Sequence, residues 1–447
     1  MSNKQAIVIG AGLAGSEAAW QLAERGVTVT LYEMRPEKLT PAHHTGQFAE
    51  LVCSNSLKSD ILPSAAATLK SELQMMGSFV LECARECNVA AGNALAVDRD
   101  LFSALVTKRI CSHANIRVVR DEVQSLMALS TKAINNQIIV ASGPLTSDAL
   151  VADIQKIIGR DYLSFYDAAA PIVAADSLDM KKIFAQSRYD NGTPDYLNAP
   201  MNNLQYNAFI EALLGARRVQ LKDFERRELF AACQPLEEVA RTGNDALRFG
   251  ALKPVGLIDP MTGRRPWAAV QLRAENASRT AYNLVGFQTN LTFPEQERVF
   301  RMIPGLEQVR FERFGVMHRN TFIDTPHVLG KNLQLPMLPH IRFAGQITGT
   351  EGYAEAIASG LFASLAAYAA LLNTEMPTLP EESVFGALLA YATNAETLDY
   401  QPMHVNFGIV PPVMGKLKKR ERYCAYSERA LQATKVFVQK CKESGLL

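Results

Sequence analysis

The chain has 447 residues, of which 48% are hydrophobic, so it can bury a large core and is expected to form two or three domains. Its net charge of +1 at pH 7 identifies no partner, and any nucleic-acid surface must therefore be a local patch. We expect no secretory signal, because the start is polar and glycines interrupt the first apolar run. We expect no membrane span either, because no stretch of about eighteen unbroken apolar residues occurs.

The first predicted elements are a strand, a glycine-rich turn, a helix and a second strand. An apolar strand over residues 6–9 leads into the turn, a helical pattern covers 16–25, and the second strand covers 27–32. The acidic Glu33 follows the second strand directly. This order of elements is typical of a dinucleotide-binding unit.

Each glycine of the turn has a physical role in such a unit. Gly10 permits the tight turn, Gly12 lets backbone N–H groups approach a pyrophosphate, and Gly15 lets helix and strand pack closely. The carboxylate of Glu33 can accept hydrogen bonds from the ribose of an adenosine. The residues predicted to bind the dinucleotide here are Gly10, Ala11, Gly12, Leu13, Ala14, Gly15 and Glu33.

The next segment, ELVCSNSLKSD over residues 50–60, places Cys53 among small polar residues with Lys58 nearby. A reactive thiolate needs a polar, electropositive and accessible setting, so Cys53 is a candidate reactive thiol. Cys83 and Cys87 lie one helical turn apart among apolar neighbours and are expected to be structural.

Seven cysteines in all are scattered without the spacing of a disulfide framework or a zinc site, which predicts the reducing cytoplasm. No cluster of His, Cys and Asp has metal spacing, so we expect no metal.

Two later segments favour FAD over NAD as the dinucleotide. QIIVASGPLT, over residues 137–146, is an apolar strand that ends in Ser-Gly-Pro, and residues 341–372 read as a strand, a glycine-rich turn and a long alanine-rich helix. The N-terminus of that helix can face a flavin ring or a pyrophosphate. Its turn adds Gly345, Gln346 and Gly352 as candidate cofactor contacts. We find no second glycine motif, and hence no separate NAD(P)H domain.

Between these segments the pattern changes to shorter strands, such as 170–174, with frequent turn signals. We therefore expect an α/β fold in which a Rossmann-like FAD-binding domain of the glutathione-reductase type is split by an inserted α/β domain. The expected domains are 1–151, the N-terminal part; 152–325, the insertion that caps the flavin; and 326–447, the C-terminal part with a basic tail. No Gly/Ser-rich linker marks these boundaries.

Several longer motifs carry a resemblance to one family. The chain resembles the folate- and FAD-dependent tRNA (uracil-5-)-methyltransferases, the TrmFO family, over essentially its whole length. The motifs include GAGLAGSEAAWQL, TPAHHTGQFAELVCSNSL, DYLNAPM, LKPVGLIDPMTG, GVMHRNTF and FAGQITGTEGY.

The resemblance implies methyl transfer to C5 of a uridine in the T loop of tRNA, at position 54. In that reaction 5,10-methylenetetrahydrofolate supplies the carbon, reduced FAD supplies the electrons, and NADH or NADPH reduces the flavin again. Uracil C5 is a poor nucleophile until a thiolate adds at C6, which gives the cysteines a role.

The family pattern of a cysteine before Pro-x-Glu-Glu matches Cys233, with Glu237 and Glu238 beside it. We favour Cys233 as the thiol that attacks C6 and Cys53 as its partner near the flavin, although the two roles could be reversed. The family often has a third cysteine where this chain has Ala199, so an active chain would show that this thiol is not required.

A histidine of the family stacks on the pterin of the folate, and this role corresponds to His318, with Arg319 next to it. His43 and His44 precede Cys53, and either could transfer a proton or only form a turn.

Two basic patches could contact RNA phosphates, although a charge run also suits a solvated helix face. Their members are Lys416, Lys418, Lys419, Arg420 and Arg422, and Arg217, Arg218, Lys222, Arg226 and Arg227. The residues also allow an enzyme that methylates ribosomal RNA, a flavin oxidoreductase of a small substrate, or a flavin-binding RNA chaperone. The oligomeric state stays open.

Overall fold

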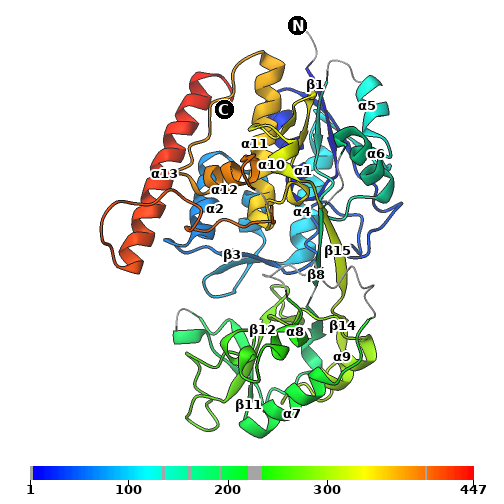
Figure 1. The fold of residues 1–447 in the computed structure, drawn as a ribbon. Helices are drawn as coiled ribbons and strands as arrows, with labels where there is room; N and C mark the ends of the chain where they lie inside the picture. The colour runs from blue at the N-terminus through cyan, green and yellow to red at the C-terminus, as the bar shows by residue number, and fades with distance from the viewer. Residues whose placement is uncertain are drawn as a thin grey trace.

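The computed structural model describes residues 4–132, 136–159, 163–168, 170–190, 193–219, 234–397 and 400–447, without the side chains of 132, 163–168, 190 and 317–319. Figure 1 shows two bodies joined by the strands β8 (Leu163–Ala168) and β15 (Met317–Phe322), which pair antiparallel.

The first body is built on a six-stranded sheet of order β16-β17-β7-β1-β2-β6. All neighbouring strands run parallel except the edge strand β16, which pairs antiparallel with β17. Strands from opposite ends of the chain, β7 and β17, are neighbours in this sheet. The strands are β1 (Gln5–Ile9), β2 (Thr28–Tyr32), β6 (Ile116–Val119), β7 (Gln137–Val140), β16 (Gln334–Leu335) and β17 (Leu338–Phe343).

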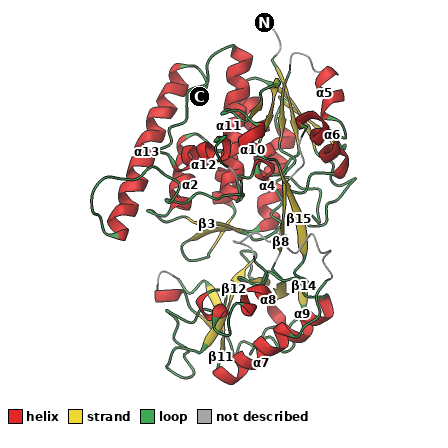
Figure 2. Ribbon diagram, in the orientation of Figure 1, coloured by secondary structure: helices red, strands yellow, loops and turns green. Residues whose placement is uncertain are grey.

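Helices cover this sheet, as the red and yellow elements of Figure 2 show. The two innermost helices, α1 (Leu13–Glu24) and α11 (Tyr353–Leu372), contact each other so closely that a Cβ on Gly360 would lie 2.2 Å from the backbone oxygen of Ala14. The other helices are α2 (Ala65–Met75), α3 (Phe79–Glu86), α4 (Arg99–Ser112), α5 (Leu126–Lys132), α6 (Asp148–Ile158), α10 (Thr325–Val328), α12 (Val384–Thr393) and α13 (Lys419–Glu443). A small sheet of β3 (Ser56–Ser59), β5 (Ala94–Val97) and β4 (Asn88–Val89) completes the body.

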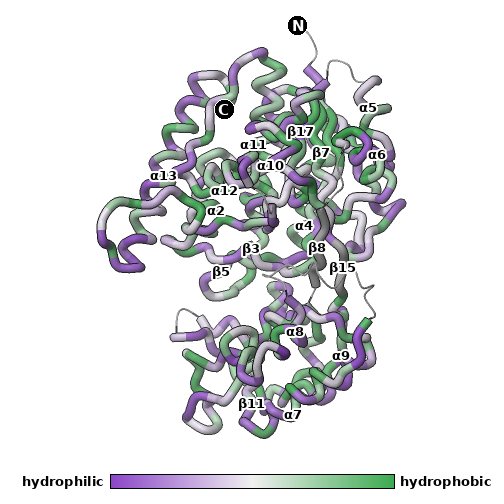
Figure 3. Tube along the Cα trace, viewed as in Figure 1, coloured by the Kyte–Doolittle hydropathy of each residue, from purple (hydrophilic) through white to green (hydrophobic). Residues whose placement is uncertain are grey.

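Helix α11 is the one helix in the described part of the chain that is long and apolar enough to cross a membrane. However, 78% of its most apolar stretch is buried inside the protein, and buried core helices can be equally long and apolar. Figure 3 shows hydrophobic residues gathered where β7, β17 and α11 lie.

The second body contains a sheet of order β10-β11-β12-β13-β9-β14 with its own apolar core, which includes Val173, Val270 and Leu284. All its strand pairs are antiparallel. Its strands are β9 (Ile172–Ala174), β10 (Phe184–Ala185), β11 (Tyr196–Met201), β12 (Ala268–Ala274), β13 (Ala281–Leu284) and β14 (Phe311–Arg313), and its α-helices are α7 (Asn203–Leu214), α8 (Leu236–Arg241) and α9 (Phe293–Phe300).

The predicted α/β fold class is confirmed, and two details differ from the expectation. Helix α1 begins at Leu13, three residues before the predicted start, because its first turn lies within the glycine motif. The predicted boundary after residue 151 falls inside α6, whose Leu150 and Ile154 pack in the core of the first body. We therefore propose the β8–β15 pair as the junction between the two bodies.

Candidate cofactor and thiol site

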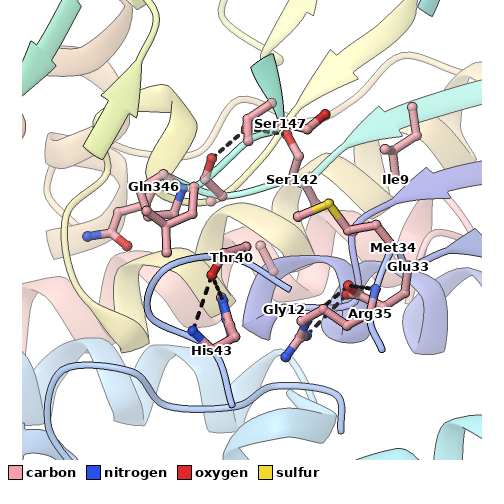
Figure 4. Close-up of a pocket in the computed structure, with 18 of the residues that line it drawn as sticks. Ile9, Gly12, Glu33, Met34, Arg35, Thr40, His43, Ser142, Ser147 and Gln346 are labelled. Atoms are coloured by element: carbon pink, nitrogen blue, oxygen red, sulfur yellow. Dashed lines mark hydrogen bonds and ion pairs between the residues drawn. The ribbon is translucent and has the colours of Figure 1, made fainter. Parts of the chain in front are cut away.

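A cavity lies where the parallel strands of the first body end. Gly10 follows β1, Glu33 follows β2, Ser142 follows β7 and Gly345 follows β17, and all four residues line this cavity. Ligands of open parallel sheets bind at this edge. We call it the glycine-turn cavity, and Figure 4 shows residues that line it.

Most of the predicted dinucleotide residues line the glycine-turn cavity, and three do not. Ala11 and Gly15 are buried behind it, and Gly352 lines a neighbouring cavity. The predicted residues in its wall are Gly10, Gly12, Leu13, Ala14, Glu33, Gly345 and Gln346.

The three glycines of the turn have different surroundings. Gly10 has a φ of +95°, and a Cβ there would lie 2.6 Å from the oxygen of Ala141. A Cβ on Gly15 would lie 1.8 Å from the oxygen of Gly10. A Cβ on Gly12 would meet nothing within 4 Å. The packing of the protein itself requires Gly10 and Gly15, whereas Gly12 faces open space.

Glu33 is a buried carboxylate that holds the glycine turn in place. Its Oε2 accepts a hydrogen bond of 2.9 Å from the N–H of Ala11, and its Oε1 lies 3.0 Å from Nε of Arg35. Burial acts to raise the pKa of Glu33, but the hydrogen bonds and charge of Arg35 outweigh it and hold the pKa below its ordinary value. The side chain is therefore ionised at neutral pH. Glu33 accepts four hydrogen bonds in all, one from the N–H of Ala11 and three from the N–H, Nε and Nη2 of Arg35. These match the about four lone-pair sites of a carboxylate, so a ligand hydroxyl would bind Glu33 in exchange for one of them.

The segment between β2 and Cys53 forms another wall. Arg35 also pairs with Glu50 at 3.0 Å, and Glu50 accepts from the N–H of His44. His43 lies in the wall itself, where its Nδ1 is 2.6 Å from Oγ1 of Thr40 (Figure 4).

A second cavity, the Cys53 cavity, adjoins the first. The two share Val52, Pro144, Gln346 and Tyr353 in their walls. The remaining wall residues are Cys53, Ser54, Ser56, Leu57, Lys58, Arg273, Asn320, Glu351, Gly352, Ala354 and Glu355. Lys58, noted in the sequence beside Cys53, lies 3.6 Å from the Glu355 carboxylate. The structure therefore brings Cys53 next to the predicted dinucleotide residues.

Tyr353 and the second body hold the loop that carries Cys53. The hydroxyl of Tyr353 accepts hydrogen bonds from the backbone N–H groups of Cys53 at 3.0 Å and Ser54 at 3.1 Å. Burial raises the pKa of this tyrosine, so it stays neutral. From β12, Arg273 donates to Oδ1 of Asn55 at 2.8 Å and to Oγ of Ser54 at 2.7 Å.

Other predicted site residues lie outside what the structure describes. Cys233 is outside the described residues. The backbone of His318 and Arg319 lies in β15, opposite Asp167 and Tyr166 of β8, but their side chains are not described.

The two acids near Cys233 have structural partners. Glu237 is buried, accepts from the N–H of Asn290 at 2.7 Å and from Oγ1 of Thr289 at 2.9 Å, and has a pKa raised by burial. Glu238 pairs with Arg218.

The remaining described cysteines lie away from both cavities. Cys83 is fully buried, and burial raises its pKa to about 12, as suits a structural thiol. The six described cysteines form no disulfide. Among the described residues no group of three or more His, Cys, Asp or Glu side chains could hold a metal.

The residue-level predictions assigned no role to Arg35, Arg273, Asn320 or Tyr353. All four lie in motifs that carry the family resemblance: YEMRP for Arg35, AAVQLR for Arg273, GVMHRNTF for Asn320 and FAGQITGTEGY for Tyr353. Their contacts involve segments up to 300 residues away, which no local pattern reveals.

Comparison with known proteins places these features in a family. Residues 5–375 match the family described as glucose inhibited division protein A. The chain is 52% identical over 432 residues to the methylenetetrahydrofolate--tRNA-(uracil-5-)-methyltransferase TrmFO of Heliobacterium modesticaldum, which covers 96% of this chain and 97% of that protein. It is 53% identical over 426 residues to the TrmFO protein of Pelobacter propionicus, which covers 95% and 92% of the two chains.

Among solved structures, GidA of Aquifex aeolicus is similar with a TM-score of 0.69 at 13% sequence identity. The match covers 98% of this chain and 74% of that one, and it shows a shared fold.

Proposed function

This chain belongs to the TrmFO family, and we propose on that premise that it methylates C5 of a uridine in the T loop of tRNA, at position 54, with 5,10-methylenetetrahydrofolate as the carbon donor. The observation that carries the proposal is the wall shared by the glycine-turn cavity and the Cys53 cavity. A redox cofactor, a carbon donor and a uracil ring activated by a thiol can meet at this wall.

The glycine-turn cavity suits FAD. Gly12 is the N-cap of helix α1, has no side chain to cap the helix and faces open space, so the N-terminus can accept a pyrophosphate. The ionised Glu33 suits the ribose, and Gly345 and Gln346 close the opposite wall. Bound here, FAD would supply the electrons that bring the transferred carbon to the methyl level, with NADH or NADPH as the source of reducing equivalents.

The two thiols act on the uracil ring in this proposal. Cys233 adds to C6, and Cys53 assists at the flavin side, or the roles are reversed; in both cases the ring must reach the Cys53 cavity. Tyr353 and Arg273 hold the Cys53 loop while the ring enters. After C5 has acquired the carbon, a base removes the C5 proton and the thiol leaves.

The folate is assigned to the same region. We assign pterin stacking to His318, with Arg319 beside it, because β15 carries both residues to the wall that holds Asn320.

The basic segment before and at the start of α13 suits RNA. Lys416, Lys418, Lys419, Arg420 and Arg422 are all exposed, and no ion pair is recorded for them within the described residues. In the other basic patch, Arg217 pairs with Glu295 and Arg218 with Glu238, and its remaining members, Lys222, Arg226 and Arg227, lie outside the described residues. The α13 patch is therefore the stronger candidate for phosphate contacts.

We place this activity in the cytoplasm, which is supported by the absence of disulfides among the described cysteines.

Nucleoside mass spectrometry of tRNA and ribosomal RNA, from cells with and without this protein, tests the proposal. We expect 5-methyluridine to disappear from tRNA when the protein is absent and to return when it is restored. Loss from ribosomal RNA alone would instead identify an rRNA methyltransferase. No change in either RNA would favour a flavin oxidoreductase of a small substrate.

A further inference from the structure

Asn320 is a buried amide whose hydrogen-bonding capacity the protein does not use. Its side chain is 1% exposed, it lines the Cys53 cavity, and neither Oδ1 nor Nδ2 has a hydrogen-bond partner among the described residues. Buried polar groups in proteins are almost always paired, because an unpaired one loses its water without compensation. An exception in the wall of a cavity indicates that a ligand supplies the partner.

Two other buried asparagines show what this chain does with an amide that has only a structural role. Nδ2 of Asn55 donates to the oxygens of Val97 and Ala274 at 3.1 Å and 3.0 Å. Nδ2 of Asn198 donates to the oxygen of Gln186 at 2.8 Å, and its Oδ1 accepts from Gln271. The buried Asn283 also leaves its Nδ2 without a partner, but Asn320 leaves both Nδ2 and Oδ1 without one among the described residues.

We propose that the side-chain amide of Asn320 binds the lactam edge of a substrate ring that enters the Cys53 cavity. One N–H donor and one C=O acceptor on the amide match one C=O and one N–H on the ring. This inference rests on the proposed function, which supplies two such substrate rings: the target uracil, through N3–H and an adjacent carbonyl, and the pterin of the folate. The flavin ring of FAD has the same kind of edge and is the alternative that the flavin measurement below tests.

The surroundings of Asn320 suit a polar ring. In the same wall, Oε1 of Glu355 accepts from the N–H of Val405, but its buried Oε2 has no hydrogen-bond partner among the described residues. Arg273 adds a positive charge. Both rings must come close to this wall, because the uracil has to reach Cys53 and the position assigned to the pterin is His318. In the chain, His318 stands two residues before Asn320 in β15.

The variant Asn320→Leu separates ligand binding from structure, because leucine has the same branched shape and no polar atom to leave unpaired. A structural role predicts unchanged activity. Ring binding predicts a protein that unfolds at the same or a higher temperature but loses about tenfold to a hundredfold in kcat/KM. Asn320→Asp, which replaces the donor by an acceptor, should lose a similar factor. Asn207→Ala, on the exposed face of α7, is the control.

Three measurements on the flavin-loaded proteins identify the ring. The first is covalent trapping of a T-arm RNA that carries 5-fluorouridine, at saturating folate. The second is the KM for methylenetetrahydrofolate, and the third is flavin content with its reduction by NADPH. Loss of trapping assigns Asn320 to the uracil, and a raised KM for folate with normal trapping assigns it to the pterin.

A change in flavin content or reduction alone, or wild-type behaviour in all three measurements, would overturn the inference. An inactive wild-type protein would overturn the proposed function itself, so the two failures are distinguishable.

Discussion

Gly12 and Gly15 are three residues apart in one turn, yet a side chain would have different consequences at each. The Cβ of a substituted Gly15 would collide with the oxygen of Gly10 at 1.8 Å, so the strand and helix could not keep their packing. The Cβ of a substituted Gly12 would project into the glycine-turn cavity without a clash. Gly15 is therefore required by the packing of the protein, whereas Gly12 leaves space for the ligand.

We predict that Gly12→Val folds with a normal unfolding midpoint but purifies without flavin, whereas Gly15→Val loses both flavin and stability. The reason is that valine at position 12 fills only the space proposed for the pyrophosphate. Flavin absorbance and thermal unfolding of both variants check this. Full flavin content in a folded Gly12→Val protein would disprove the placement of FAD.

Single residues also show how far the sequence can be interpreted. Gly10, Gly15 and Glu33 could be predicted because their roles follow from a local pattern. Tyr353 and Arg273 could not be given a role, because the groups they hold, at Cys53 and Ser54, are more than 200 residues away. Such contacts exist only once the sheets have assembled.

At the scale of elements, a buried carboxyl joins two helices of the first body. Glu72 of α2 accepts from the N–H groups of Val384 at 2.8 Å and Phe385 at 3.1 Å, in the first turn of α12. Burial nevertheless raises the pKa of Glu72 to about 8. The folded protein therefore holds a proton that the unfolded chain, with an ordinary carboxyl pKa near 4.5, releases.

This proton makes folding depend on pH in a defined direction. Because the pKa of Glu72 is raised on folding, its contribution to stability is fully present below about pH 4.5 and is lost as the pH rises toward about 8. Glu72→Gln removes that loss. We predict that the free energy of unfolding of Glu72→Gln, relative to wild type, rises by up to about 1.4 kcal/mol per pH unit across this window.

Urea unfolding of both proteins at several pH values measures this difference, with the exposed Glu428→Gln as the control. A difference that stays constant with pH would contradict the raised pKa of Glu72.

Helix α13 carries the prediction for RNA. We expect Lys416→Gln, Arg420→Gln and Arg422→Gln together to weaken tRNA binding at least tenfold. The slope of log K for binding against log salt concentration should become shallower by about 0.7–0.9 for each phosphate contact that is lost. Reduction of the flavin by NADPH should not change. The matched control replaces Lys435, Lys440 and Lys442, exposed residues toward the other end of the same helix. Fluorescence anisotropy over a range of salt concentrations checks this, and equal losses in the two triple variants would exclude a specific RNA surface.

At the scale of the whole molecule, the Cys53 loop depends on both bodies. Arg273 of β12, in the second body, donates to Ser54 and Asn55. Glu275, which follows β12 directly, pairs with Arg99 of α4 in the first body. The split of the fold was predictable, because strand and helix patterns of the FAD-binding type occur at both ends of the chain. The junction that we propose was not predictable, because it is a strand pair with no linker composition to mark it.

The central claim is that this chain transfers a carbon from methylenetetrahydrofolate to uridine C5 in tRNA. The most direct test incubates the purified flavin-loaded protein with unmodified tRNA, NADPH and methylenetetrahydrofolate labelled with ¹³C in its methylene group, followed by mass spectrometry of the nucleosides. The account predicts 5-methyluridine that carries the ¹³C atom in the T loop and that does not form when the folate is omitted. Unlabelled 5-methyluridine made with S-adenosylmethionine in place of the folate, or no product under either condition, would contradict it.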